Sequence, residues 1–180
     1  MSKSSKPFLQ VLRLLIPIIL TLLWLCFIFG NSLQTGAASG SASGKVHAII
    51  NAIPEALGLG SPVSHYFVRK AAHFTEFARL TFFICSDLIC FRLVSLKQSL
   101  KRSLPILSAA LPMGIICAVA DELLQNVSKD RGPSVTDVLI DSSGVLFATI
   151  SFMILFVFIR FYINKYMMNN TTRKTHFFNI

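Results

Sequence analysis

The sequence predicts an all-α, polytopic membrane protein with about four transmembrane helices and a short interfacial helix. Hydrophobic residues make up 53% of its 180 residues and charged residues only 14%, whereas about a quarter of a soluble domain is charged. The hydrophobic residues are concentrated in several long runs, and a run of about 20 residues is enough to cross a bilayer as a helix. Because these runs leave no room for a separate soluble domain, we expect residues 1–180 to form one membrane domain. Its core should cover about residues 8–163, followed by a polar, basic tail at 164–180.

The first span is expected at residues 8–30, which include a long apolar stretch that starts at Leu14. Basic residues precede this run and small residues follow it, as in cleaved signal peptides. The run is long for a signal peptide, so we expect a retained helix. Residues 35–44 are rich in Gly, Ser and Ala and are expected to be flexible. A short amphipathic helix should follow and lie at the membrane surface, because the apolar residues of 46–57 recur at helical spacing.

Three further spans are expected at about residues 67–94, 104–124 and 138–163. The first of these is polar in its first half and apolar in its second. In the next, Pro105 suits a helix start, and Pro112 is expected to kink the helix. The four cysteines all lie inside apolar runs, where a free thiol behaves as a small hydrophobic group, so no disulfide is expected.

The basic residues predict the orientation of these spans. Most of the 17 Lys and Arg residues lie in the N-terminal segment, the connection after residue 91, and the C-terminal tail. Four spans place these segments on one side of the membrane, and the positive-inside rule makes that side cytoplasmic. We therefore expect a multi-pass protein of the cell membrane with both termini in the cytoplasm. The net charge of +9 is also typical of nucleic-acid-binding proteins, but these bases flank apolar runs, so no nucleic-acid partner is expected.

All acidic residues except Asp87 lie toward the opposite side, and several share helix faces with other polar residues. Residues three or four apart lie on the same helix face, which groups the polar residues near the outer ends of the second, third and fourth spans. Gly144 on the fourth span should allow close helix approach. Charges this near hydrocarbon are costly unless they are paired or hydrated, so they are candidates for function. The set comprises Lys70, His73, Glu76, Glu122, Gln125, Arg131, Asp137 and Asp141.

Two interpretations of this set remain open. In the functional one, a histidine beside a carboxylate acts as general acid or base, and arginine binds phosphate or carboxylate. The candidate catalytic residues are then His73, Glu76, Glu122 and Asp137, and the candidate ligand-binding residues are Lys70, Gln125, Arg131 and Asp141. The ligand would be a membrane lipid or a cell-wall precursor with an anionic group. In the structural interpretation, the basic residues Lys70, Arg79 and Arg131 only neutralise the acids and hold three helices together.

No metal or other cofactor is expected. His73 and Glu76, with acids from the other spans, offer the nitrogen and oxygen donors that divalent metals use. The neighbouring Arg69, Lys70 and Arg131 oppose the binding of a cation.

Three segments carry a family resemblance: RKAAHFTEF at 69–77, DELLQ at 121–125 and RGPSVTDV at 131–138. In type and order they resemble the motifs of the VanZ-like family, which is named for a determinant of low-level teicoplanin resistance. These motifs are K-x-x-H-F-x-E-Y, then E-x-x-Q, and then an Arg followed by D-V-x-x-N/D-x-x-G. The segment NSLQ at 31–34 is also similar to the family's usual exit from its first helix. Two positions depart from the pattern, with Phe77 in place of the usual Tyr and Asp141 where Asn is common.

The resemblance implies a small multi-span protein with an outward-facing polar site and a link to the cell envelope and to low-level teicoplanin resistance. It implies no particular reaction. A membrane enzyme, a hydrolase or transferase acting on a lipid-linked phosphate at the outer leaflet, is therefore an alternative, as is a structural membrane scaffold. The sequence also leaves a homo-oligomer open.

Overall fold

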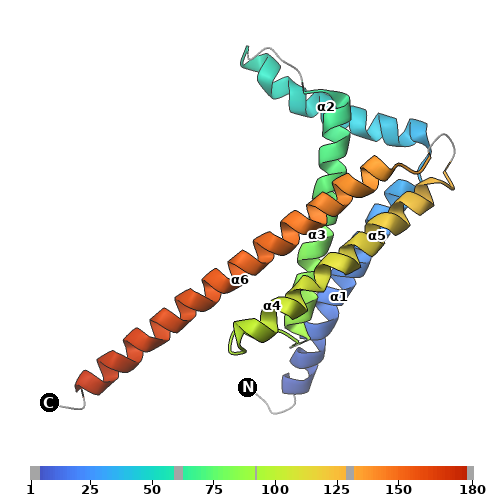
Figure 1. Cartoon of the computed structure of the whole chain (residues 1–180). Helices are drawn as coiled ribbons and strands as arrows, with labels where there is room; N and C mark the ends of the chain where they lie inside the picture. Colours follow the sequence, from blue (N-terminus) through green and yellow to red (C-terminus); the bar gives the residue numbers. More distant parts are fainter. Residues whose placement is uncertain (1–4, 59–62, 92, 129–131, 178–180) are drawn as a thin grey trace.

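The computed structural model describes residues 5–58, 63–91, 93–128 and 132–177, without the side chains of residues 5–10, 42, 53 and 167–177. Within these ranges the protein contains helices and no strand, which confirms the all-α prediction (Figure 1). The helices are α1 (Ser5–Ser32), α2 (Gly36–Ala56), α3 (His65–Cys90), α4 (Leu100–Ser108), α5 (Ala110–Gln125) and α6 (Val135–Phe177).

Within the described ranges, three stretches are long and apolar enough to cross a membrane: Val11–Ser32, Leu100–Gln125 and Val135–Tyr166. They correspond to the first, third and fourth expected spans. Their outward surfaces are rich in apolar side chains such as Leu23 and Ile154, which are 62% and 64% exposed. Apolar exposure on this scale suits lipid surroundings. The protein is therefore a helical membrane protein.

Helix α3 has 26 residues but carries charges along its length, so it is less apolar than the other three stretches. It contacts each of the other described helices, and α6 crosses it at an angle in Figure 1. Its second half belongs to the protein core, where Phe77 and Leu80 are almost completely buried. A tyrosine at position 77 would need a hydrogen-bond partner for its hydroxyl in this packed core, whereas Phe77 needs none.

The expectation of a flexible segment at 35–44 is wrong, because α2 includes almost all of it. Thr35 supports the start of the helix: its side chain accepts a hydrogen bond from the Ala38 amide at 3.3 Å, and its carbonyl accepts one from Ser39. Such side-chain capping satisfies a backbone donor that helix geometry leaves open. Helix α2 lies across one end of the bundle (Figure 1). Its exposed apolar residues Val46 and Ile49 fit the expected interfacial position.

The third expected span is two helices, α4 and α5, which meet at Ala109. Proline has no amide hydrogen, so Pro112 cannot donate to the Ser108 carbonyl and the helical hydrogen-bond pattern breaks there, as expected for a kink. The fourth span begins at Val135, and its helix continues to Phe177. Much of the polar tail expected at 164–180 is therefore helical.

Different helix ends and connecting segments lie at the two ends of the bundle. The start of α1, the end of α6 and the α3–α4 connection lie at one end (Figure 1). Helix α2, the turn that precedes it, the end of α5 and the start of α6 lie at the other end. This arrangement matches the grouping of segments that the basic residues predict, while the assignment of the first end to the cytoplasm stays a prediction. Residues Cys26, Cys85, Cys90 and Cys117 are free, as expected.

Candidate functional site

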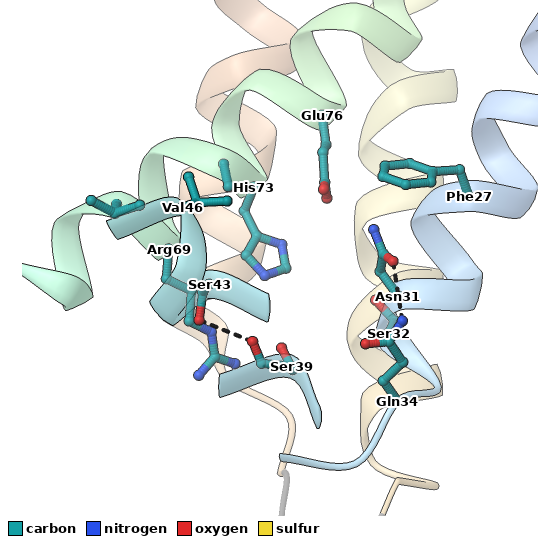
Figure 2. Close-up of a pocket in the computed structure, with 12 residues that line it drawn as sticks. Phe27, Asn31, Ser32, Gln34, Ser39, Ser43, Val46, Arg69, His73 and Glu76 are labelled. Atoms are coloured by element: carbon teal, nitrogen blue, oxygen red, sulfur yellow. Dashed lines mark hydrogen bonds between the residues drawn. The ribbon is translucent and has the colours of Figure 1, made fainter. Parts of the chain in front are cut away.

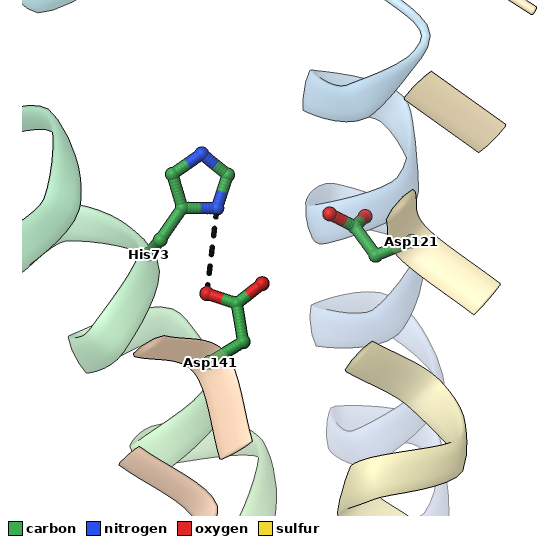
Figure 3. Close-up of side chains that lie close together, drawn as sticks. All are labelled: His73, Asp121 and Asp141. Carbon is green, nitrogen blue, oxygen red and sulfur yellow. Dashed lines mark ion pairs between the residues drawn. The ribbon is translucent and has the colours of Figure 1, made fainter. Parts of the chain in front are cut away.

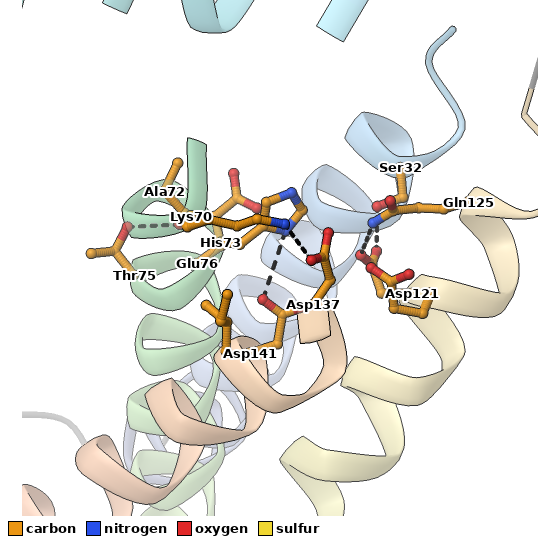
Figure 4. Close-up of polar contacts among 12 residues, drawn as sticks. Ser32, Lys70, Ala72, His73, Thr75, Glu76, Asp121, Gln125, Asp137 and Asp141 are labelled. Carbon is orange, nitrogen blue, oxygen red and sulfur yellow. Dashed lines mark hydrogen bonds and ion pairs between the residues drawn. The ribbon is translucent and has the colours of Figure 1, made fainter. Parts of the chain in front are cut away.

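The predicted polar residues that the structure describes come together at the end of the bundle that carries α2, where α1, α3, α5 and α6 meet (Figure 4). We call this set the polar cluster. It consists of Ser32, Lys70, His73, Glu76, Asp121, Glu122, Gln125, Asp137 and Asp141. Seven of these residues were predicted from the sequence; Ser32 and Asp121 were not among the site candidates.

Lys70 on α3 forms an ion pair with Asp137 in the first turn of α6. Both side chains are largely buried, with 16% and 9% of their surface exposed. The Ser134 hydroxyl accepts a hydrogen bond from the Asp137 amide at 3.3 Å and donates one to its carboxylate at 3.2 Å. A carboxylate in the first turn is also favoured by the helix dipole. The start of α6 is thus anchored to α3 by charge.

Asp121 lies at the centre of the cluster with none of its surface exposed. It accepts hydrogen bonds from the Ser32 hydroxyl at 2.5 Å and from the Gln125 side chain at 3.0 Å. These contacts join α1 to α5 and fix the orientation of the carboxylate. The four-residue spacing of Asp121 and Gln125 places them on one helix face, and this signal could have identified Asp121 from the sequence.

Glu122 holds the connection between α5 and α6. Its buried carboxylate accepts a hydrogen bond from the Ser134 amide at 2.8 Å. The hydroxyl of Ser128, in the same connection, donates to the Ser32 carbonyl at 3.0 Å. Arg131, the other predicted site residue here, lies outside the described residues, and its ligand-binding role stays a prediction.

His73 and Asp141 face each other across the α3–α6 contact, with 3.7 Å between His73 Nδ1 and Asp141 Oδ1 (Figure 3). Asp121 approaches the pair from α5. Donor atoms of these three residues lie within 4.8 Å of one another, so they are the described residues best placed to hold a metal ion. The sequence did not predict this combination, because it depends on the packing of three helices.

A cavity of about 350 Å³ lies next to the polar cluster, between α1, α2 and α3 (Figure 2). His73 and Glu76 line it from α3 together with Arg69, and Ser39 and Ser43 line it from α2. Asn31 of α1 also lines it and interacts with the Glu76 carboxylate. Sequence reasoning missed the hydroxyls of α2, because it treated their segment as a flexible linker.

Two other charged residues of α3 lie in different surroundings. The guanidinium of Arg79 lies over the Trp24 ring, 4.7 Å from its centroid, an arrangement that attracts a cation to the ring face. The carboxylate of Asp87 accepts a hydrogen bond from Thr21 at 2.7 Å. Both contacts tie α3 to α1. The structural interpretation left open in the sequence would have Arg79 neutralise the acids, whereas the described contact of its guanidinium is with Trp24.

A protein-family model described as VanZ/LLP1 matches residues 17–160 of the chain. The matched segment includes every residue of the polar cluster and all of the cavity lining. No curated protein matches the chain, and no solved structure matches it.

Proposed function

The chain belongs to the VanZ/LLP1 family, and we propose that it binds an anionic lipid or cell-wall precursor at the outer leaflet of the cell membrane. The observation that carries the proposal is the cavity beside the polar cluster, which combines a guanidinium, an imidazole, two amides, hydroxyls and the Glu76 carboxyl group in about 350 Å³. A pocket with a few converging polar groups is the usual form of a small-ligand site.

Arg69 is the residue we assign to the anionic group. Its side chain lines the cavity, and its buried Nε atom has no hydrogen-bond partner among the described residues. A guanidinium offers a planar set of donors that matches phosphate and carboxylate oxygens. The serine hydroxyls of α2 and the Asn31 amide add neutral donors around the same space.

The apolar surroundings of the cavity suit a ligand that carries a hydrocarbon chain. Phe27, Val46 and Val68 line its wall, and the exposed face of α2 is apolar at Val46 and Ile49. A lipid could place its headgroup in the cavity while its chain remains in the bilayer. The location at the α2 end of the bundle corresponds to the outer leaflet if the positive-inside orientation holds.

Low-level teicoplanin resistance is the cellular effect we propose, by resemblance to the VanZ-like family. By binding an envelope precursor, this protein would reduce the access of a glycopeptide to its target. Fold and family alone do not determine function, so this step depends on the ligand-binding site.

Lipid binding in nanodiscs tests the proposal. The purified chain should bind a long-chain polyprenyl phosphate more tightly than the corresponding polyprenol, which lacks the phosphate. Arg69→Ala should remove this preference. Arg79→Ala is the matched control, because Arg79 belongs to the same helix but lies over Trp24. Equal binding of the two lipids by the wild-type chain would contradict the proposal.

A second candidate function is a hydrolase or transferase that acts on a lipid-linked phosphate. It is favoured by His73, which lines the cavity and has Asp141 3.7 Å from its Nδ1 atom. A histidine close to a carboxylate can act as a general base. Turnover of polyprenyl-linked phosphates by the purified chain, abolished in His73→Ala, would establish this function; the absence of turnover with and without added metals would reject it.

A further inference from the structure

Asp141 is a buried acid whose carboxylate lacks hydrogen-bond donors among the described residues. None of its surface is exposed, and neither carboxylate oxygen accepts a hydrogen bond within the part of the chain that the structure describes. Its ion-pair partner there is His73, at 3.7 Å. Burial of a carboxylate without hydrogen bonds is costly, and other acids of the cluster lie nearby. A bound cation would compensate this charge.

Donor atoms from three different helices surround the position that such a cation would occupy (Figure 3). They come from His73 on α3, Asp121 on α5 and Asp141 on α6, and all lie within 4.8 Å of one another. Ligand atoms around a tetrahedral zinc ion are roughly 3.4 Å apart, since each is about 2.1 Å from the metal. Small side-chain rotations would bring this set to that spacing.

The groups around the three residues also fit a metal site. Ser32 and Gln125 donate hydrogen bonds to the two oxygens of Asp121, and metal-binding carboxylates are commonly oriented in this way. Lys70, which the sequence suggested would oppose a cation, is engaged in an ion pair with Asp137. Its charge is therefore largely offset.

We propose that His73, Asp121 and Asp141 bind a divalent transition-metal ion, Zn²⁺ or Mn²⁺, at the junction of α3, α5 and α6. The donor set of one imidazole and two carboxylates suits these metals. It offers too few oxygens for Ca²⁺, which takes six to eight oxygen ligands. This proposal departs from the expectation of no metal, which was based on the neighbouring basic residues.

The metal would also contribute to ligand binding. Three protein ligands leave a coordination position open, and His73 lines the cavity between α1, α2 and α3. A phosphate or carboxylate oxygen of a bound headgroup would complete the coordination from that side. The metal would thus offset the acids of the cluster and attract an anion. This step, unlike the metal site itself, rests on the proposed function.

The test measures Zn²⁺ and Mn²⁺ binding to the full-length chain, purified in detergent with a histidine-free tag and stripped with a chelator. Equilibrium dialysis followed by elemental analysis should give about one ion per chain. His73→Ala, Asp121→Asn and Asp141→Asn should each weaken binding by about tenfold or more, the range that even changes outside the ligand shell can cause. Absence of binding, or binding unchanged in all three variants, would overturn the proposal.

Two matched controls identify binding elsewhere. Asp87→Asn removes a carboxylate from the other half of α3 and should leave binding intact. His47 and His65 form a close ring pair, 5.4 Å between centroids, and are the histidines outside the site whose side chains the structure describes. The double variant His47→Ala, His65→Ala should keep the bound ion. Loss of binding in this double variant alone would show that the ion belongs to the histidine pair and overturn the proposal.

Stability and lipid binding complete the experiment. Metal should raise the thermal midpoint of the wild-type chain because it binds only the folded state, and it should not raise that of Asp141→Asn. The thermal midpoint of Asp141→Asn measured without metal shows whether this variant folds. If it folds but binds no metal, the loss of binding is due to the missing ligand and not to unfolding. Polyprenyl phosphate binding is measured in the same preparations. Metal binding without lipid binding would support the metal site and reject the proposed function. Lipid binding without metal binding would reject only the metal site.

Discussion

Gly144 of α6 packs against the backbone of Phe74 in α3, so closely that a Cβ atom at position 144 would collide with the Phe74 carbonyl oxygen. This contact brings the two helices together just beside the polar cluster. Asp141 and Asp137 lie within two turns of Gly144, and they meet His73 and Lys70 of α3. The absence of a side chain at one position thus helps to assemble the site.

Gly144→Ala should lower the stability of the protein and separate α3 from α6. Forcing one extra methyl group into a tightly packed position typically costs about 1–3 kcal/mol, and here the obstacle is backbone that cannot rotate away. The thermal midpoint in detergent measures the effect. Gly30→Ala is the control, because nothing lies within 4 Å of a Cβ at that position. Equal midpoints for Gly144→Ala and the wild type would show that the contact is dispensable.

Lys70→Ala should destabilise the protein by about 2 kcal/mol, because it leaves the Asp137 carboxylate without its charged hydrogen-bond partner. The charge swap Lys70→Asp with Asp137→Lys should recover most of that loss. Chemical unfolding in mild detergent checks both variants. If the swap restored lipid binding as well as stability, the pair would have a purely structural role. A swap no more stable than Lys70→Ala would count against the ion pair itself.

Glu122→Gln should loosen the connection between α5 and α6. The Glu122 carboxylate accepts a hydrogen bond from the Ser134 amide, and an ionised acceptor forms a stronger bond than a neutral one. Hydrogen exchange at the Ser134 amide should therefore become faster, while exchange in the middle of α5 should not change. Unaltered protection of Ser134 would mean that other contacts hold this connection.

Residue Ser134 should be accessible from outside the cell. In a cysteine-free background, a cysteine at position 134 should react with an impermeant thiol reagent in intact cells. A cysteine at Ser99, between α3 and α4, should react only after permeabilisation. The positive-inside rule predicts this difference, and both positions lie outside the long helices. The reverse labelling pattern would place the polar cluster at the cytoplasmic side.

The fold class and much of the polar cluster could be predicted because their signals are local in the sequence. Hydrophobic runs identify α1, α5 and α6, and the spacing of Lys70, His73 and Glu76 identifies the polar face of α3. Gly144 was predicted to allow close helix approach, and the structure confirms it. The helix that Gly144 meets could not be predicted, because the sequence pattern does not specify a partner.

Contacts between distant segments account for what the sequence did not predict. Ser32 and Asp121 are 89 residues apart in the chain, and no pattern in either helix indicates that they meet. The cavity has the same origin, since its wall requires α2 to be helical and to lie across the end of the bundle. The Gly, Ser and Ala residues of α2 are weak local signals, and tertiary packing decides their conformation.

Teicoplanin susceptibility tests most directly whether the polar cluster and the adjacent cavity carry the function. The wild-type chain and variants with equal membrane abundance would be expressed in a teicoplanin-susceptible host, and the minimal inhibitory concentration measured. The wild type should raise this concentration, and His73→Ala, Arg69→Ala and Glu122→Ala should each abolish the increase, while Arg79→Ala should keep it. An increase that persists in all three cluster and cavity variants, or no increase with the wild type, would contradict the proposed function.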